Sequence, residues 1–363
     1  MEYITLKEIA EITMGQSPDS KTYNEDKEGI PFYQGKSDFG KLNPVPRVWC
    51  SKPVKIAKKN DILISVRAPI GDTNITREQC CIGRGLASIR PINSTNINDK
   101  YLYYLINSKY NELNKFGTGS TFKAITKDSL CNLKCKKVPD INIQIEIAKK
   151  LDMVNRLIEI RKKQIESLNT LIKSQFVEMF ENDKYPFKTL DEITEKITDG
   201  SHNPPTGATE KTEYMMLSSQ NIINNSINYE NARYLSKEDF KKENKRTFLK
   251  RGDVLLTIVG TVGRTAIIGN EDNITLQRSV AVIKPKLDVN SQYLVGAFNS
   301  DYIIQQLNKG AKGVAQKGIY LKDLKKILIK IPPLNLQNQF ADIVKQTDKQ
   351  KFEDMITILK EII

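Results

Sequence analysis

The chain has 363 residues, of which 39% are apolar, so it has enough material for two or three folded domains and is not a disordered protein. Its apolar runs fall far short of the ~20 residues that a membrane span requires, and the start MEYITLKEIAEI lacks the basic-then-apolar pattern of a secretion signal. We therefore expect a cytoplasmic protein. The formal charge of +13 favours a polyanionic partner, of which nucleic acid is the commonest.

In chain order, the first predicted elements occur twice. Residues 5–9, TLKEI, place Thr three residues before Glu, the capping-box spacing of a helix start, and residues 189–193 repeat it as TLDEI. Residues 60–71, NDILISVRAPIG, predict a buried strand that a glycine turn closes. Residues 252–263, GDVLLTIVGTVG, predict the same strand and turn again.

Further pairs of similar strings follow in the same order along the two halves. They are IGRGLASIRP (82–91) with LQRSVAVIKP (276–285), YLYYLINS (101–108) with YLVGAFNS (293–300), FGTGSTFKAI (116–125) with GAKGVAQKGI (310–319), and LKCKKVPDINIQIEIA (133–148) with LIKIPPLNLQNQFA (328–341). Because the order is kept while the loop lengths differ, we interpret the chain as an internal duplication of one α/β domain.

Between the two copies, residues 143–180 contain neither Gly nor Pro, and apolar residues recur at alternating steps of four and three. This spacing is typical of a coiled-coil seam, which only Arg161 and Gln175 interrupt. About 38 residues at about 1.5 Å each predict a rod of roughly 57 Å. The apolar seam positions are Ile147, Leu151, Val154, Ile158, Ile165, Leu168, Ile172 and Met179.

A seam of this kind requires a partner helix. The C-terminal stretch 336–363 provides one, with spacing that slips near Thr347, from Leu336, Phe340, Ile343, Phe352, Met355, Leu359 and Ile362. We expect the two helices to pack as an antiparallel coiled coil; the alternative is that each packs only on its own domain. The predicted fold is α/β (α+β), with tandem α/β domains at 1–140 and 183–333, a central coiled-coil spacer helix at 141–182 and a C-terminal coiled-coil helix at 334–363.

Strings that resemble catalytic motifs lack the residues that would complete them. The sequence Asn-Pro-Pro-Thr at 203–206 is similar to the signature of amino-methyltransferases, but Thr206 replaces the aromatic residue that stacks on a flipped base. Asp140 with Glu146 and Lys149 is similar to a nuclease metal site, but the spacing is too long by one residue. No Walker A loop is present. We predict binding domains with no catalytic residue.

The histidine and cysteine residues argue against a metal centre. The single histidine, His202, excludes paired-histidine sites, and its setting DGSHNPP suits a polar contact loop. An odd number of cysteines in a cytosolic chain favours buried thiols over disulfides. Cys131 and Cys135 form a CxxxC pair, although a zinc site would need two further ligands. The other cysteines are Cys50, Cys80 and Cys81.

Two half-sized α/β domains, each followed by a heptad helix, resemble the DNA specificity subunit of type I restriction-modification systems. The resemblance covers essentially the whole chain, and its motifs are the strand-turn pairs at 60–71 and 252–263, the loops at 116–125 and 310–319, and IPPLNLQNQFADIV at the start of the last helix. Departures occur where Ile143-Gln144 and Leu336-Gln337 replace Glu-Gln and where Pro139-Asp140 replaces a double proline. The second helix is also shorter than the first.

The resemblance implies that each domain is a target recognition domain that binds one half of a bipartite double-stranded DNA site. It implies that the helices act as a spacer and dock two methyltransferase (M) subunits, which carry S-adenosylmethionine and methylate adenine. Restriction (R) subunits, where present, would use ATP and Mg. This chain itself would hold no cofactor. The alternatives are a self-contained DNA methyltransferase or nuclease, and a tandem DNA-binding protein without a modification partner.

Base recognition needs side chains that match groove edges, namely Arg and Lys for guanine and Asn and Gln for adenine, whereas phosphate contacts need positive charge. We expect DNA contacts from residues in or beside turns that flank predicted strands. In the first domain these are Gln34, Lys36, Arg67, Arg84 and Lys123, and in the second Ser201, His202, Gln220, Asn221, Arg264, Arg278, Gln316 and Lys317. Arg84 and Arg278 recur in both copies, which favours a backbone or scaffold contact over base recognition. A solvated surface role is the alternative for each residue.

Overall fold

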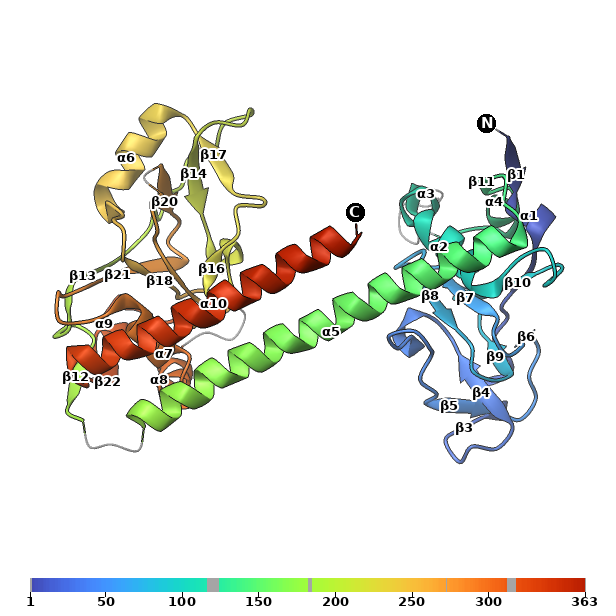
Figure 1. Ribbon diagram of the computed structural model, residues 1–363, viewed down its shortest axis with the longest axis horizontal. Helices are drawn as coiled ribbons and strands as arrows, with labels where there is room; N and C mark the ends of the chain where they lie inside the picture. Colours follow the sequence, from blue (N-terminus) through green and yellow to red (C-terminus); the bar gives the residue numbers. More distant parts are fainter. Residues whose placement is uncertain (1, 116–123, 182–184, 272, 312–317, 363) are drawn as a thin grey trace. The chain divides into compact units, whose positions relative to one another are not determined.

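The computed structural model describes residues 2–115, 124–181, 185–271, 273–311 and 318–362, and it forms two compact units, Met1–Leu157 and Ile158–Ile363 (Figure 1). The chain passes from the first unit to the second inside one long helix, α5 (Ile141–Phe180). None of the helices in these ranges combines the length and the apolar character that a bilayer span requires.

The first unit is built on an antiparallel sheet of order β2-β10-β7-β8. Its strands are β2 (Ala10–Met14), β10 (Leu86–Pro91), β7 (Ile62–Ser65) and β8 (Thr73–Ile75). Helices cover one face of the sheet, where Leu6, Leu102 and Leu113 pack against Ile64 and Ala87. These helices are α1 (Leu6–Ile9), α2 (Asp99–Ser108), α3 (Tyr110–Lys115) and α4 (Lys127–Cys131), and a short pair, β1 (Tyr3–Thr5) with β11 (Lys134–Lys136), lies beside them.

The opposite face of this sheet packs on a second sheet of order β3-β5-β4-β9-β6, through Leu63 and Leu86 against Tyr33 and Ile82. The second sheet consists of β3 (Tyr23–Asn24), β5 (Val48–Cys50), β4 (Ile30–Tyr33), β9 (Cys80–Ile82) and β6 (Ile56–Ala57), and 3-10 turns η1 (Ser20–Thr22) and η2 (Lys36–Asp38) flank its strands. Only β4 and β9 run parallel within it. Their carboxyl ends therefore meet at one edge of the unit.

The cysteines lie almost entirely in this unit's cores. The prediction of buried thiols is confirmed for Cys50, Cys80, Cys81 and Cys135, whereas Cys131 is half-buried, and all five are free. Burial raises the pKa of the Cys80 thiol, so this side chain is neutral and unreactive. Across the described residues, no group of three or more His, Cys, Asp or Glu side chains is arranged to hold a metal ion.

The second unit repeats the plan of the first, which confirms the predicted duplication. Its main sheet has the order β13-β21-β18-β19 and consists of β13 (Thr194–Asp199), β21 (Val280–Pro285), β18 (Val254–Thr257) and β19 (Thr265–Ile267). The short pair is β12 (Phe187–Thr189) with β22 (Leu328–Lys330), and the second sheet contains β17 (Arg233–Leu235), β14 (Tyr214–Leu217) and β20 (Ile274–Leu276), the last two parallel. The remaining elements are η3 (Ser219–Asn221), the hairpin β15 (Ile222–Ile223)–β16 (Ser226–Ile227), α6 (Lys237–Thr247), α7 (Ser291–Phe298), α8 (Asp301–Gly310), α9 (Leu321–Leu324) and α10 (Leu334–Ile362).

A fully buried glutamine fixes the start of each long helix to its own unit. Gln144 of α5 accepts a hydrogen bond from the Asn98 amide at 3.0 Å and donates to the Pro139 carbonyl at 2.7 Å. Gln337 of α10 repeats both bonds, to the Asn290 amide at 2.9 Å and the Pro332 carbonyl at 2.9 Å. Since each side chain bonds one backbone group of the loop before it and one at the start of another helix, α2 or α7, the first turn of each long helix is held in a defined direction.

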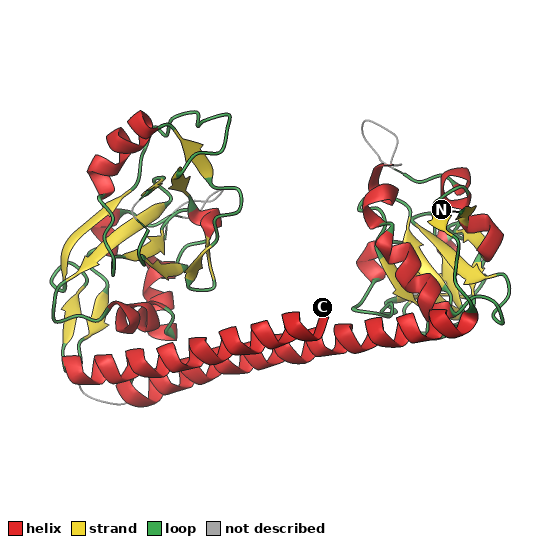
Figure 2. Ribbon diagram, turned by 45° about the horizontal axis from the view of Figure 1, so that its top comes forward, coloured by secondary structure: helices red, strands yellow, loops and turns green. Residues whose placement is uncertain are grey.

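In the second unit, the end of α5 and the start of α10 pack antiparallel to one another and on α7 (Figure 2). The ring of Phe340 lies 5.4 Å from that of Phe176 and 5.7 Å from that of Phe180. Gly296 of α7 makes this approach possible, because a Cβ atom there would lie 2.8 Å from both the Phe176 and the Phe340 rings. The helices thus pack on each other, as the coiled-coil prediction expects. They also pack on the domain, as the alternative expects, so each describes part of the contact.

The buried stripe differs from the predicted seam. Phe176 and Phe180, off the seam, are the buried residues of α5 in the second unit, whereas the seam residues Ile172 and Met179 are only partly buried. On α10, the predicted seam residue Phe340 is buried, but so is Val344, which is off the seam, and the predicted seam residue Phe352 is 60% exposed. The stripe is shifted because these helices face α7 as well as each other. Leu151 is also exposed, and the side chains of Met355, Leu359 and Ile362 lie outside the described residues.

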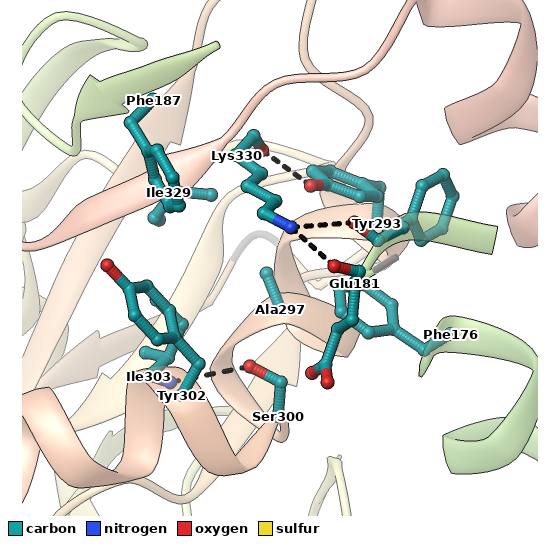
Figure 3. Close-up of a pocket in the computed structure, with 11 residues that line it drawn as sticks. Phe176, Glu181, Phe187, Tyr293, Ala297, Ser300, Tyr302, Ile303, Ile329 and Lys330 are labelled. Atoms are coloured by element: carbon teal, nitrogen blue, oxygen red, sulfur yellow. Dashed lines mark hydrogen bonds between the residues drawn. The ribbon is translucent and has the colours of Figure 1, made fainter. Parts of the chain in front are cut away.

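Lys330 of β22 closes the C-terminal end of α5 (Figure 3). Its Nζ donates to the carbonyl oxygens of Glu181 at 2.6 Å and Phe180 at 3.4 Å, beside an apolar cavity of about 350 Å³ lined by aromatic rings. The Tyr293 hydroxyl donates to the Lys330 carbonyl at 2.5 Å, and burial raises the pKa of Tyr293. A cation at this position satisfies helix carbonyls that have no partner within the helix and opposes the negative end of the helix dipole.

We expect Lys330→Met to loosen the end of α5 and to lower the free energy of unfolding of the second unit by about 1–2 kcal/mol. Hydrogen exchange of residues 170–181 measures the effect directly. The matched control is Lys136→Met, because Lys136 is the equivalent residue of β11 and is exposed. Equal exchange in the wild-type and Lys330→Met proteins would contradict the assigned role.

Candidate nucleic-acid interface

In the first unit, loops from four strands meet at the carboxyl ends of β4 and β9. The amide of Gly83 donates to the Tyr33 carbonyl at 2.8 Å, that of Gln16 to Ile82 at 2.9 Å, and that of Val66 to Gly85 at 2.9 Å. Gly85 is required here, since a Cβ atom would lie 2.3 Å from the carbonyl oxygen of Gln34. We name residues 15–17, 34–36, 67 and 83–85 the first loop cluster.

The same hydrogen bonds form at the equivalent place in the second unit. The amide of Gln277 donates to Leu217 at 2.8 Å, that of Ser201 to Leu276 at 2.8 Å, and that of Ile258 to Ser279 at 2.9 Å. We name residues 200–202, 218–220, 259–260 and 277–279 the second loop cluster. Two sets of loops are therefore held on one repeated backbone frame while their side chains differ.

The structure brings the described predicted residues of the first domain together in the first loop cluster. Gln34, Arg67 and Arg84 are exposed there, and no described residue bonds their side chains. Lys36 is also exposed, and its Nζ lies 2.8 Å from Asp72 Oδ2, a hydrogen bond that raises the pKa of Lys36. These four predicted residues thus present one amide and three cations to solvent, a composition that suits both base edges and phosphates.

Three predicted residues of the second domain occupy the second loop cluster with exposed side chains: His202, Gln220 and Arg278. Arg264 is exposed too, but it lines a different hollow, together with Ile165 of α5 and Phe352 of α10. Arg264 is the equivalent of Asp72 in the first copy, because both amides bond the side chain of the residue that ends the preceding strand, Thr257 at 2.9 Å or Ser65 at 3.0 Å.

Two predicted contact residues are structural instead. Asn221 is 3% exposed, and its side chain accepts from the Ser218 amide at 2.9 Å and donates to the Asn228 carbonyl at 2.9 Å. Ser201 is 7% exposed and joins two loops through its backbone. Both side chains face the protein, so we withdraw them from the set of contact residues. Lys123, Gln316 and Lys317 lie outside the described residues.

The setting of His202 was not evident from the sequence. Its Nε2 lies 2.8 Å from Oδ2 of Asp199, a residue that is 6% exposed at the end of β13. Arg246 of α6 bonds the other carboxylate oxygen of Asp199 through Nη2 and donates from Nε to the Asp199 carbonyl at 2.9 Å. The three side chains form one polar group whose outer member, His202, is half exposed to solvent.

Gln16 and Ser17 of the first loop cluster were missed as candidates. They hold the positions that Ser201 and His202 hold in the second copy, and Gln16 is exposed. The signal was present in the sequence, since ITMGQS at 12–17 aligns with ITDGSH at 197–202 around a shared glycine. A Cβ atom at Gly15 would lie 2.1 Å from the Gly83 carbonyl oxygen, and at Gly200 2.0 Å from that of Leu276, so both turns need glycine.

Comparisons with known proteins agree with this duplicated plan. The family model described as type I restriction modification DNA specificity domain matches residues 1–170 and again 182–362. A Methanocaldococcus jannaschii protein described provisionally as the MjaX type I restriction enzyme specificity subunit is 43% identical over 157 residues, 43% of this chain and 36% of that protein. The EcoBI specificity subunit of Escherichia coli is 21% identical over 379 residues, 94% of this chain and 78% of that subunit.

A solved structure extends the likeness to the whole fold. The S subunit of a type I restriction-modification system from M. genitalium aligns with 99% of this chain and 92% of its own, with a TM-score of 0.55 and 13% identity. The duplicated sheets, the glutamine-anchored helices and the two family matches together cover nearly the entire sequence. The chain therefore belongs to the family of type I restriction-modification DNA specificity proteins.

Proposed function

We propose that this chain is the non-catalytic DNA sequence-specificity subunit of a type I restriction-modification complex. Each loop cluster contacts one half of a bipartite double-stranded DNA site. The observation that carries this proposal is the repeated backbone frame, which presents Gln16, Gln34 and Arg84 in one copy and His202, Gln220 and Arg278 in the other. A constant frame with different polar side chains is what two different half-sites require.

Within each cluster, we assign the side chains to two tasks. Arg84 and Arg278 occur in both copies, so they contact phosphates, which are the same in every sequence. The side chains that differ, Gln16 and Gln34 or His202 and Gln220, contact base edges. Lys36 and Arg67 add positive charge beside the first half-site. Arg264, Lys123, Gln316 and Lys317 stay predictions.

The long helices dock the partner subunits in this proposal. On α5, Met153 is 65% exposed, Leu171 47%, Ile160 44% and Val177 42%, an unusual amount of apolar surface for a solvated helix. Helices of two methyltransferase subunits would cover these side chains. S-adenosylmethionine then belongs to those partners, and ATP and Mg to restriction subunits where they join, while this chain binds no cofactor.

Mapping of methylated bases in cells with and without this chain tests the function. We expect a bipartite adenine-methylated motif that disappears when the chain is removed and returns when it is restored. Exchange of residues 183–333 for the equivalent domain of a relative should change one half of the motif and leave the other half unchanged. Methyl transfer by the pure chain alone would refute the assignment as a non-catalytic subunit.

A further inference from the structure

We propose that Asp199 and Arg246 are positioning residues that fix His202 in one tautomer, so that His202 recognises the exocyclic amino group of adenine or cytosine. This inference deepens the proposed function and rests on it. It assigns to the second unit a device for base recognition that the first unit lacks, and it names the groups of the base that the device selects.

The geometry determines which ring nitrogen carries the hydrogen. A carboxylate only accepts hydrogen bonds, so the 2.8 Å contact between Asp199 Oδ2 and His202 Nε2 requires a hydrogen on Nε2. The Arg246 guanidinium lies 3.5 Å from the same nitrogen, but a guanidinium only donates hydrogen bonds and cannot accept one from Nε2–H. It bonds the Asp199 carboxylate instead. In its neutral form, the His202 ring therefore keeps Nδ1 as an acceptor, and no described residue bonds Nδ1.

The first copy of the domain shows that the fold does not need this buried carboxylate. Met14 ends β2 at the position where Asp199 ends β13, with the same pairing to the neighbouring strand: Met14 is opposite Ala87 and Asp199 opposite Ala281. Removal of the Asp199 carboxylate from water costs free energy, which an apolar residue at the same position avoids. We infer that Asp199 and Arg246 are retained for what they do to His202.

A ring acceptor on a half-exposed side chain discriminates between bases in a simple way. In the major groove, adenine N6 and cytosine N4 are amino donors, whereas guanine O6 and thymine O4 are acceptors that would face the Nδ1 lone pair. The fixed tautomer thus favours adenine or cytosine at one position of the half-site and disfavours guanine and thymine. If His202 rotated freely, it would present Nε2–H as readily as Nδ1 and would select less.

Selection from a pool of duplexes with a randomised segment, with the full chain as bait, tests this inference. The wild-type chain should enrich adenine or cytosine at one position of one half-site. His202→Ala and Asp199→Met should both lose that preference, with affinity for the selected duplex falling about five- to tenfold, and Arg246→Met should follow them. Asp199→Met copies the first domain and is therefore expected to fold, and an unchanged preference in the other half-site reports folding in the same measurement.

A base analogue isolates the single hydrogen bond. Replacing the selected base by an analogue without its exocyclic amino group should weaken wild-type binding by the same five- to tenfold and leave His202→Ala binding unchanged. Ser17→Ala, the equivalent change in the first copy, should alter only the other half-site.

Three outcomes would overturn the inference. If His202→Ala leaves every preference unchanged, His202 does not recognise a base. If His202→Ala loses the preference while Asp199→Met and Arg246→Met keep it, the two residues do not position the ring. If the wild-type chain enriches no sequence, the proposed function is contradicted, and the inference that rests on it is contradicted too. This result differs from the other two because it appears in the wild-type selection itself.

Discussion

Asp61→Ala should lower the free energy of unfolding of the first unit by about 3–5 kcal/mol, because it removes the buried partner of Arg90 and leaves only the exposed Glu11, 3.6 Å from Arg90 Nη1. Asp61 is 1% exposed, and Arg90 of β10 donates hydrogen bonds to both of its carboxylate oxygens, from Nε to Oδ1 at 2.6 Å and from Nη2 to Oδ2 at 2.7 Å. The same carboxylate accepts the Lys58 amide at 2.8 Å, which closes the turn into β7. One substitution thus removes an ion pair and one of the hydrogen bonds that close the turn.

The only tryptophan of the chain makes the effect measurable in one unit. Trp49 lies in β5 of the first unit, so the urea dependence of its fluorescence follows the unfolding of that unit alone. The matched control is Asp253→Ala, which removes the equivalent carboxylate of the second unit, bonded there by Lys284 and by the Lys250 amide at 2.8 Å. Asp253→Ala should leave the Trp49 transition in place and shift only the part of the circular-dichroism transition that does not coincide with it.

The energetic cause can be separated from simple loss of a side chain. Replacement of both partners by apolar residues, Asp61→Leu with Arg90→Met, removes the ion pair without leaving a charge behind, and such exchanges are often neutral or stabilising. We therefore expect the double variant to be more stable than Asp61→Ala. A Trp49 transition that is unchanged in Asp61→Ala would show that water solvates Arg90 adequately without its carboxylate.

The duplication and the long helices could be predicted because their signals are local strings. The pairs NDILISV and GDVLLTI carry the same strand and turn chemistry, and the absence of Gly and Pro from 143–180 predicts one helix. The buried stripe of that helix could not be predicted in the same way. Phe176 is buried because Gly296, far away in the sequence, leaves space for its ring and that of Phe340 against α7, and Phe180 packs on Tyr293 of the same helix.

The candidate interface was predictable in part for the same reason. Turns that follow buried strands are visible in the sequence, so Gln34, Arg84 and Arg278 were identified from their neighbours. Asn221 was assigned wrongly, because its residue type suits a base contact equally well as a turn that binds its own backbone. The link from Asp199 to Arg246 spans 47 residues, and no periodicity marks a pair brought together only by packing of α6 on the sheet.

Removal of both arginines that the two copies share should have the largest effect on DNA binding. Arg84 and Arg278 are exposed at equivalent loops, and no described residue bonds either side chain. If each donates charge-assisted hydrogen bonds to a phosphate, each should contribute about tenfold or more to affinity, so Arg84→Ala with Arg278→Ala should weaken binding of a selected duplex by about 100-fold at low salt.

The salt dependence of binding distinguishes a phosphate contact from base recognition. Each lost phosphate contact should reduce the slope of log affinity against log salt by about 1, so the double variant should lose about 2 from the slope while it keeps the base preferences of both half-sites. Gln34→Ala is the matched control, because an uncharged side chain in the same cluster should change the preference of the first half-site and leave the slope as it is. If the double variant instead lost a preference for guanine and kept the slope of the wild-type chain, the two arginines would contact base edges. The repeated frame would then recognise the same base in both half-sites.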